Sequence, residues 1–130
     1  MELILNPYPF SVMLFFNEVE YAEECQKRDW KDMTFIEDGE WASVQTKGSL
    51  AVVRFSEDCN KMTTIKRAGV VSHEMMHVLQ QLQEYICEDE PGREFQAYHL
   101  QALVEYCLDE MEKAYTPTVS PGISEDTPGE

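Results

Sequence analysis

The chain has 130 residues and a mass of 15.1 kDa, which suits one domain with its own core and is short for two. Its 25 acidic and 10 basic residues give a formal net charge of -15, which argues against binding nucleic acid or anionic membranes. The longest apolar run, Val12 to Phe16, is too short to span a bilayer, and the N-terminus lacks the pattern of a signal peptide. We therefore expect a globular protein that stays in the cytoplasm.

The first elements are predicted from apolar runs and their boundaries. Prolines interrupt the apolar N-terminal segment, and we predict one strand near residues 10–16. Asn17 follows as a candidate N-cap, and the apolar spacing after it predicts a surface helix over residues 18–30.

A β-hairpin is predicted next. Asp38-Gly39 indicates a turn before a strand over residues 41–46, and Lys47-Gly48 indicates a second turn before a strand over residues 50–55. Two strands joined by so short a connection should pair with each other.

Two helices complete the predicted domain. Thr63 or Thr64 can cap a helix that runs to about Tyr85, and a second amphipathic helix is expected over residues 93–114. At about 100° per residue, one stripe of the first helix is apolar; it consists of Val71, Met75, Val78 and Leu82.

These elements predict an α+β fold over residues 1–115, with an N-terminal strand and helix, a hairpin and two antiparallel helices. Residues 116–130 are rich in Pro, Ser, Thr and acidic residues. Such a segment cannot bury enough apolar surface to order itself, and we predict a disordered tail.

The sequence His73-Glu74-Met75-Met76-His77 lies in the middle of the first of these helices. Residues four apart share a helical face, with Cβ atoms about 5–6 Å apart, so two imidazoles can bind one zinc ion. Glu74, about 100° round the helix, would lie beside the ion and act as a general base on its water. An exposed polar face that happens to hold two histidines is the alternative.

A third protein ligand is then needed, because a catalytic zinc keeps only one position for water. Glu94, near the start of the second helix, is the first candidate. Glu84 lies about 10 Å along the helix axis from His77, too far to share the ion. His99 would point elsewhere if Glu94 binds, and Cys87 as a ligand would close the site and favour a structural role.

The residues from His73 to His77, the acidic turn Glu88–Gly92 and the run Glu94-Phe-Gln-Ala-Tyr98 together resemble a known arrangement. They are similar to the HExxH…ExxAY motifs of minimal gluzincin-type zinc metallopeptidases, which are short proteins often encoded by phages and prophages. The resemblance implies a zincin-like fold, a Zn²⁺ cofactor, Glu94 as the third ligand, Tyr98 supporting the site, and the host cytoplasm as the location.

The expected reaction is hydrolysis of a peptide bond in a peptide or protein substrate. Glu74 would take the proton of the attacking water and pass it to the leaving amine. The strand over residues 50–55 is our candidate for pairing with an extended peptide, and Tyr98 or Tyr85 could donate to the oxyanion.

Two other functions are compatible with the sequence. The first is a non-enzymatic, phage-type inhibitor with a structural zinc site, whose acidic surface contacts a basic protein partner. The second is a DNA mimic without metal, which needs acidic side chains concentrated on one face. The acidic residues are divided almost evenly between the two halves of the chain, so the mimic is not favoured.

Overall fold

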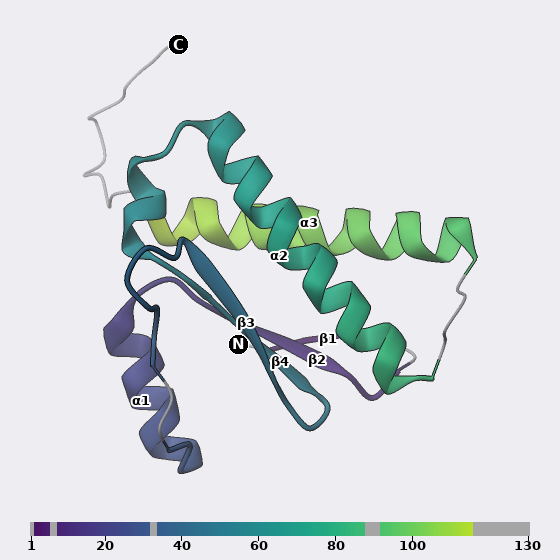
Figure 1. The fold of residues 1–130 in the computed structure, drawn as a ribbon, viewed down its shortest axis with the longest axis horizontal. Coiled ribbons are helices and arrows are strands. Elements are labelled where there is room, and N and C mark those ends of the chain that lie inside the picture. Colours follow the sequence, from purple (N-terminus) through teal and green to yellow (C-terminus); the bar gives the residue numbers. More distant parts are fainter. Residues whose placement is uncertain (1, 6–7, 32–33, 88–91, 116–130) are drawn as a thin grey trace, which may run out of the picture.

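A four-stranded mixed sheet carries helices on both faces in the computed structural model, which describes residues 2–5, 8–31, 34–87 and 92–115 (Figure 1). The elements in chain order are β1 (Glu2–Ile4), β2 (Ser11–Phe15), α1 (Glu18–Arg28), β3 (Ala42–Lys47), β4 (Leu50–Phe55), the 3-10 helix η1 (Glu57–Lys61), α2 (Thr64–Tyr85) and α3 (Arg93–Tyr115). The expected α+β class is confirmed. The predicted tail over residues 116–130 lies outside the described residues.

The strands lie in the order β1-β2-β4-β3, and only the central pair, β2 and β4, is parallel. The hairpin of β3 and β4 is confirmed, with Lys47 opposite Leu50 and Gly48 at φ 64 in the turn. The prediction that residues 50–55 offer a free strand edge is wrong, because β4 pairs with β2 on one side and β3 on the other. Among the described strands, β3 is the edge strand on this side of the sheet.

The sequence prediction missed β1, which pairs with β2. This strand has three residues and a single partly buried side chain. So short a segment shows too little alternation between apolar and polar residues to indicate a strand.

Helix α1 covers one face of the sheet. The Asn17 side chain accepts a hydrogen bond of 2.8 Å from the backbone N–H of Glu20, which confirms the predicted N-cap. The helix ends at Arg28, earlier than predicted, because Asp29 turns into the left-handed region at φ 58. Tyr21 is the buried contact of α1, in a cluster with Met13, Phe15, Leu50 and Val52 of the sheet.

Helices α2 and α3 cross over the opposite face and enclose the main core (Figure 1). Thr63 caps α2 through a hydrogen bond of 3.1 Å from the backbone N–H of Lys66. The predicted apolar stripe is confirmed: Val71, Met75, Val78 and Leu82 are all buried. No helix among the described residues has the length and apolar character to cross a membrane.

Hydrogen bonds link the start of α2 and the end of α3 to the segment that follows β4. The Arg67 side chain donates to the backbone carbonyl of Cys59 in η1 at 2.9 Å. The backbone N–H of Ser56, at the end of β4, donates to the carbonyl of Trp41 at 2.8 Å, and the Tyr115 hydroxyl donates to the carbonyl of Ser56 at 3.1 Å. These contacts join the start of α2 to η1 and the end of α3 to the residue that follows β4, which itself bonds to the residue before β3.

Two neighbouring methionines test this packing. Met75 has no exposed surface and Met76 is 40% exposed, so Met75→Ala should lower the free energy of unfolding by about 2–5 kcal/mol. Met76→Ala is the matched control and should cost less than about 1 kcal/mol. Urea unfolding followed by circular dichroism measures both; equal effects would show that α2 is packed on a different face.

Candidate functional site

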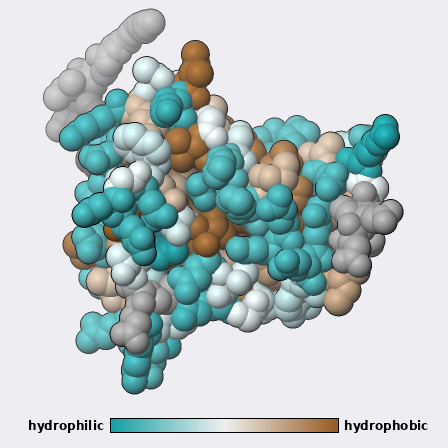
Figure 2. Space-filling view, viewed as in Figure 1, coloured by the Kyte–Doolittle hydropathy of each residue, from teal (hydrophilic) through white to brown (hydrophobic). Residues whose placement is uncertain are grey.

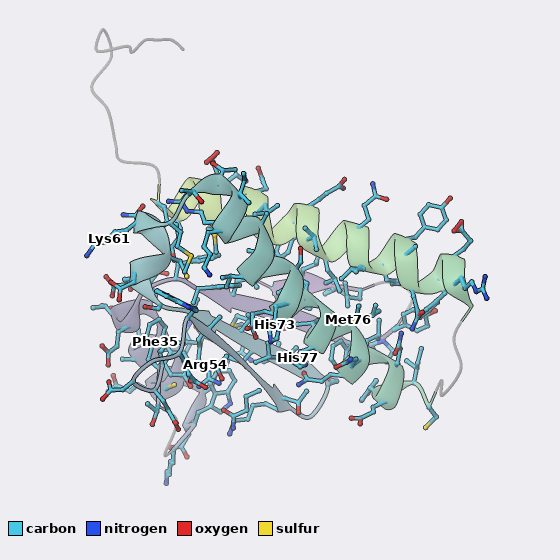
Figure 3. The ribbon with its side chains drawn as sticks, turned by 45° about the horizontal axis from the view of Figure 1, so that its top comes forward. Phe35, Arg54, Lys61, His73, Met76 and His77 are labelled. Atoms are coloured by element: carbon cyan, nitrogen blue, oxygen red, sulfur yellow. The ribbon has the colours of Figure 1, made fainter. Side chains whose placement is uncertain are left out.

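Helix α2 carries His73 and His77 on its outward face, away from the buried stripe. Both side chains are exposed, and their ring centroids are 4.9 Å apart. Figure 3 shows the two side chains on neighbouring turns of α2, on the part of its exposed surface that borders β3. The two imidazoles are therefore neighbours, as the four-residue spacing predicts, and imidazole nitrogen is a ligand that divalent transition metals accept.

Gln80 holds one of the two rings. Its Oε1 lies 3.2 Å from Nδ1 of His77. A proton on Nδ1 would be donated to that oxygen, which would leave the lone pair of Nε2 free for a ligand. Gln80 is therefore placed to orient the ring for metal binding.

Glu74 lies between the histidines and the sheet and is only 8% exposed. No hydrogen bond to its carboxylate occurs among the described residues. Burial raises the pKa of Glu74, the charge of Glu40 raises it further, and His73 and His77 lower it. A raised pKa makes this carboxylate a stronger proton acceptor than an exposed glutamate.

A groove runs between α2 and the free edge of β3, with Glu74 in its wall. Its volume is about 320 Å³. It is lined by His73, Glu74, His77 and Gln81 from α2 and by Glu40, Ala42, Ser43 and Val44 from the other side. The histidine pair and the buried carboxylate thus face a strand whose backbone groups are unpaired on that side.

An apolar pocket of about 500 Å³ adjoins the groove toward the start of α2. Its apolar lining comes from Trp41, Ala42, Ile65 and Val70. Gly69 also lines it, and no atom lies within 4 Å of where a Cβ on Gly69 would stand. Figure 2 shows exposed apolar side chains between the first half of α2 and β3, bordered by hydrophilic ones.

The structure does not bring the other predicted residues to this groove. Glu94 lies in the first turn of α3, and that end of α3 is far from where the two helices cross (Figure 1). Tyr98 is 66% exposed, and Tyr85 packs against Phe10. Within the described ranges, no three His, Cys, Asp or Glu side chains are grouped closely enough to hold a metal ion. The third ligand is therefore not identified by this arrangement, and Glu94 stays a prediction.

The alternative ligands are also away from the histidine pair. His99 uses Nδ1 to contact the carbonyl of Phe95 at 2.8 Å and stacks near that ring. Cys87 is exposed beyond the C-terminal end of α2, at φ 59. Neither residue lines the groove or the apolar pocket.

Comparison of the chain with protein-family models, curated protein sequences and solved structures finds no match. The assignment of a function therefore depends on this chain's own residues: the His73/His77 pair, the buried Glu74 and the groove beside them.

Sequence reasoning missed the contribution of the segment before β3 and of β3 itself. Glu40 and Ala42 line both the groove and its apolar pocket, and Trp41 lines the pocket. Alternation along residues 41–46 indicates which side chains share a face. It does not indicate that this face lies against α2, because that depends on the order of the strands in the sheet.

The histidine pair can be tested by metal binding. His77→Ala should reduce zinc affinity by at least about 100-fold, because one of two converging ligands is lost. His99→Ala is the matched control, since His99 lies outside the groove, and it should leave the affinity unchanged. Titration of the zinc-free protein followed by calorimetry measures both, and equal affinities for the two variants would remove His77 from the metal site.

Proposed function

We propose that the chain is a small zincin-like metallopeptidase that hydrolyses peptide bonds with zinc. The observation that carries the proposal is the placement of the histidine pair and the buried Glu74 in one groove beside an unpaired strand edge. If the HExxH sequence had arisen by chance on an exposed helical face, there would be no reason for the glutamate next to the first histidine to be buried. The cytoplasm, including a host cytoplasm for a phage-encoded chain, is the proposed location.

His73 and His77 would hold the ion, and Glu94 is the proposed third ligand. Bound zinc supplies a Lewis acid that polarises a carbonyl and lowers the pKa of water. The contribution of Gln80 is to fix the His77 ring through Nδ1. The two histidines and Glu94 would thus bind the ion, Gln80 would orient one ring, and Glu74 would transfer the proton.

Glu74 is the proposed general base. Its carboxylate would accept a proton from the attacking water at an oxygen that faces the groove and then deliver it to the leaving amine nitrogen. Burial favours this proton transfer, because it raises the pKa of Glu74 toward the pKa values of the attacking water and the leaving amine.

The substrate would lie in an extended conformation along β3. The free edge of β3 can exchange main-chain hydrogen bonds with a peptide of any sequence, in place of the edge expected for residues 50–55. A substrate side chain directed toward α2 would enter the apolar pocket beside Trp41 and Val70. This pocket favours an apolar side chain near the cleaved bond.

A non-enzymatic zinc protein with an acidic, partner-binding surface is the second candidate. It would be favoured by a metal site that a further side chain closes. Cys87, the residue expected to close such a site, does not line the groove. The groove beside Glu74 is open to a substrate, which supports the enzymatic function.

The general base is tested by Glu74→Gln. The variant should retain zinc and lose hydrolysis of a broad peptide library by at least about 100-fold, since Gln cannot accept the proton. Glu84→Gln removes an exposed carboxylate from the same helix and should keep full activity. Mass spectrometry of the peptides and elemental analysis of the protein give the two readouts; hydrolysis by Glu74→Gln at the unmodified rate would contradict the role of Glu74.

The third ligand is tested separately by Glu94→Ala. If Glu94 binds zinc, the variant should lose the metal, because two imidazoles alone bind it weakly. Glu105→Ala, on the same helix, is the control and should bind zinc at full stoichiometry. Retention of full zinc content by Glu94→Ala would remove Glu94 from the ligand set and leave the histidine pair in place.

A further inference from the structure

A polar cavity lies beside β3, on the face of the sheet that α1 covers. Its volume is about 340 Å³. Residues of the sheet and of the loop before β3 line it, among them Arg54, Ser43, Gln45, Phe35, Glu37 and Glu40. We call it the arginine cavity, and we infer that it binds the carboxamide side chain of a glutamine in the peptide that lies along β3.

Arg54, on β4, is the buried charge of the arginine cavity. It is 5% exposed, its guanidinium carbon lies 5.6 Å from the centre of the Tyr21 ring, and Figure 3 shows it close to Phe35. Of the five N–H donors of a guanidinium, one bonds to the Thr34 carbonyl and one to the Ser43 hydroxyl, the latter at 2.9 Å. Among the described residues, Nε of Arg54 has no hydrogen-bond partner and the guanidinium has no ion pair. Buried donors without acceptors cost free energy, and an acceptor oxygen in the cavity would reduce that cost.

Carboxylates line the exposed part of the same cavity. Glu37 and Glu40 are both exposed, and the backbone N–H of Glu37 donates to the Glu40 carboxylate at 3.3 Å. The arginine cavity thus offers N–H donors where it is buried and acceptor oxygens where it is exposed. A carboxamide fits both, because it carries an acceptor oxygen and an NH₂ donor group. A carboxylate would be repelled by Glu37 and Glu40, and an ammonium group would be repelled by Arg54.

The register of the hairpin directs one set of peptide side chains toward this cavity. Ser43 lies opposite Arg54, so the two share one face of the sheet, whereas Ala42 lies opposite Phe55 on the face of the main core. Successive side chains of an extended peptide on β3 alternate between the same two faces. When one peptide side chain enters the apolar pocket beside Ala42, its neighbour is therefore directed toward the arginine cavity.

The apolar wall of the cavity favours glutamine. Phe35 is partly buried against Tyr21, with ring centroids 5.6 Å apart, and offers apolar surface to the methylene groups of a glutamine stem. This inference rests on the proposed binding of a peptide along β3 and adds a second requirement to it. The substrate class is an extended peptide in which glutamine adjoins the apolar residue that enters the pocket.

Binding, measured without cleavage, tests the inference. The probes are short fluorescein-labelled peptides in which valine alternates with glutamine, methionine, glutamate or lysine; methionine resembles glutamine in length but lacks its amide. Fluorescence anisotropy with the Glu74→Gln protein should show the glutamine peptide binding about tenfold more tightly than the methionine peptide, because its amide gains hydrogen bonds in the cavity. The glutamate and lysine peptides should also bind more weakly than the glutamine peptide.

A buried variant made in the Glu74→Gln protein locates the effect. Arg54→Met removes the buried donors and should reduce the preference, measured as the ratio of the Kd values of the methionine and glutamine peptides, to less than about twofold. Arg28→Met makes the same change of charge at an exposed position of α1, outside the cavity, and should keep the tenfold ratio. Circular dichroism checks that both variants are folded.

An exposed variant gives the same test without disturbing the buried arginine. Glu37→Ala in the Glu74→Gln protein removes an acceptor and should lower the preference by about threefold or more, whether or not Arg54→Met folds. Glu23→Ala, at an exposed position of α1, is its control and should leave the ratio unchanged. Equal binding of the glutamine and methionine peptides, tighter binding of the glutamate or lysine peptide, or no binding of any peptide would overturn the inference. An unchanged preference in folded Arg54→Met or in Glu37→Ala would also overturn it.

The result is separable from the proposed hydrolysis. A protein that prefers the glutamine peptide through the arginine cavity but whose unmodified form cleaves no peptide would retain the inferred binding site and lose the proposed activity. A protein that cleaves the glutamine and methionine peptides at equal rates and binds them equally would retain the activity and lose the inferred site.

Discussion

The packing of one stripe of α2 against the sheet is the constraint on which the site depends. A helix with 3.6 residues per turn has few ways to bury Val71, Met75, Val78 and Leu82 at once, and all of them leave His73 and His77 facing outward. The orientation of the histidine pair is therefore set by the core, and the histidines need no contact of their own to hold it. Arg67 adds the position along the sheet, through its bond to the Cys59 carbonyl.

The burial of the apolar stripe and the outward orientation of the histidines together determine the surroundings of Glu74. Its position, about 100° from His73, places it at the border between the buried stripe and the outward face, so it is desolvated on one side and open to the groove on the other. Burying an unpaired carboxylate is costly, and the raised pKa of Glu74 expresses that cost. If the residue at this border had a purely structural role, an apolar or a fully exposed side chain would cost less free energy of folding. The location suits the proton transfer that we propose for Glu74.

Local sequence signals predicted the elements well and the contacts between distant elements poorly. The caps at Asn17 and Thr63 and the turn at Gly48 depend on neighbouring residues only, and each is confirmed. The role of β3 depends on β2 pairing with β4, a parallel contact between residues about 40 positions apart that no local pattern reveals. The same limit applies to Glu40, whose position beside Glu74 follows from the strand order. Glu94 was predicted from its position near the start of the second helix and from the resemblance, and Tyr98 as a residue that supports the site was predicted from the resemblance. Neither of them lines the groove or the apolar pocket.

The position of β3 at the edge of the sheet also gives the net charge a role in keeping copies of the chain apart. An unpaired strand edge is a liability for aggregation, and acidic residues around it discourage pairing between copies of this chain, which all carry the same excess charge.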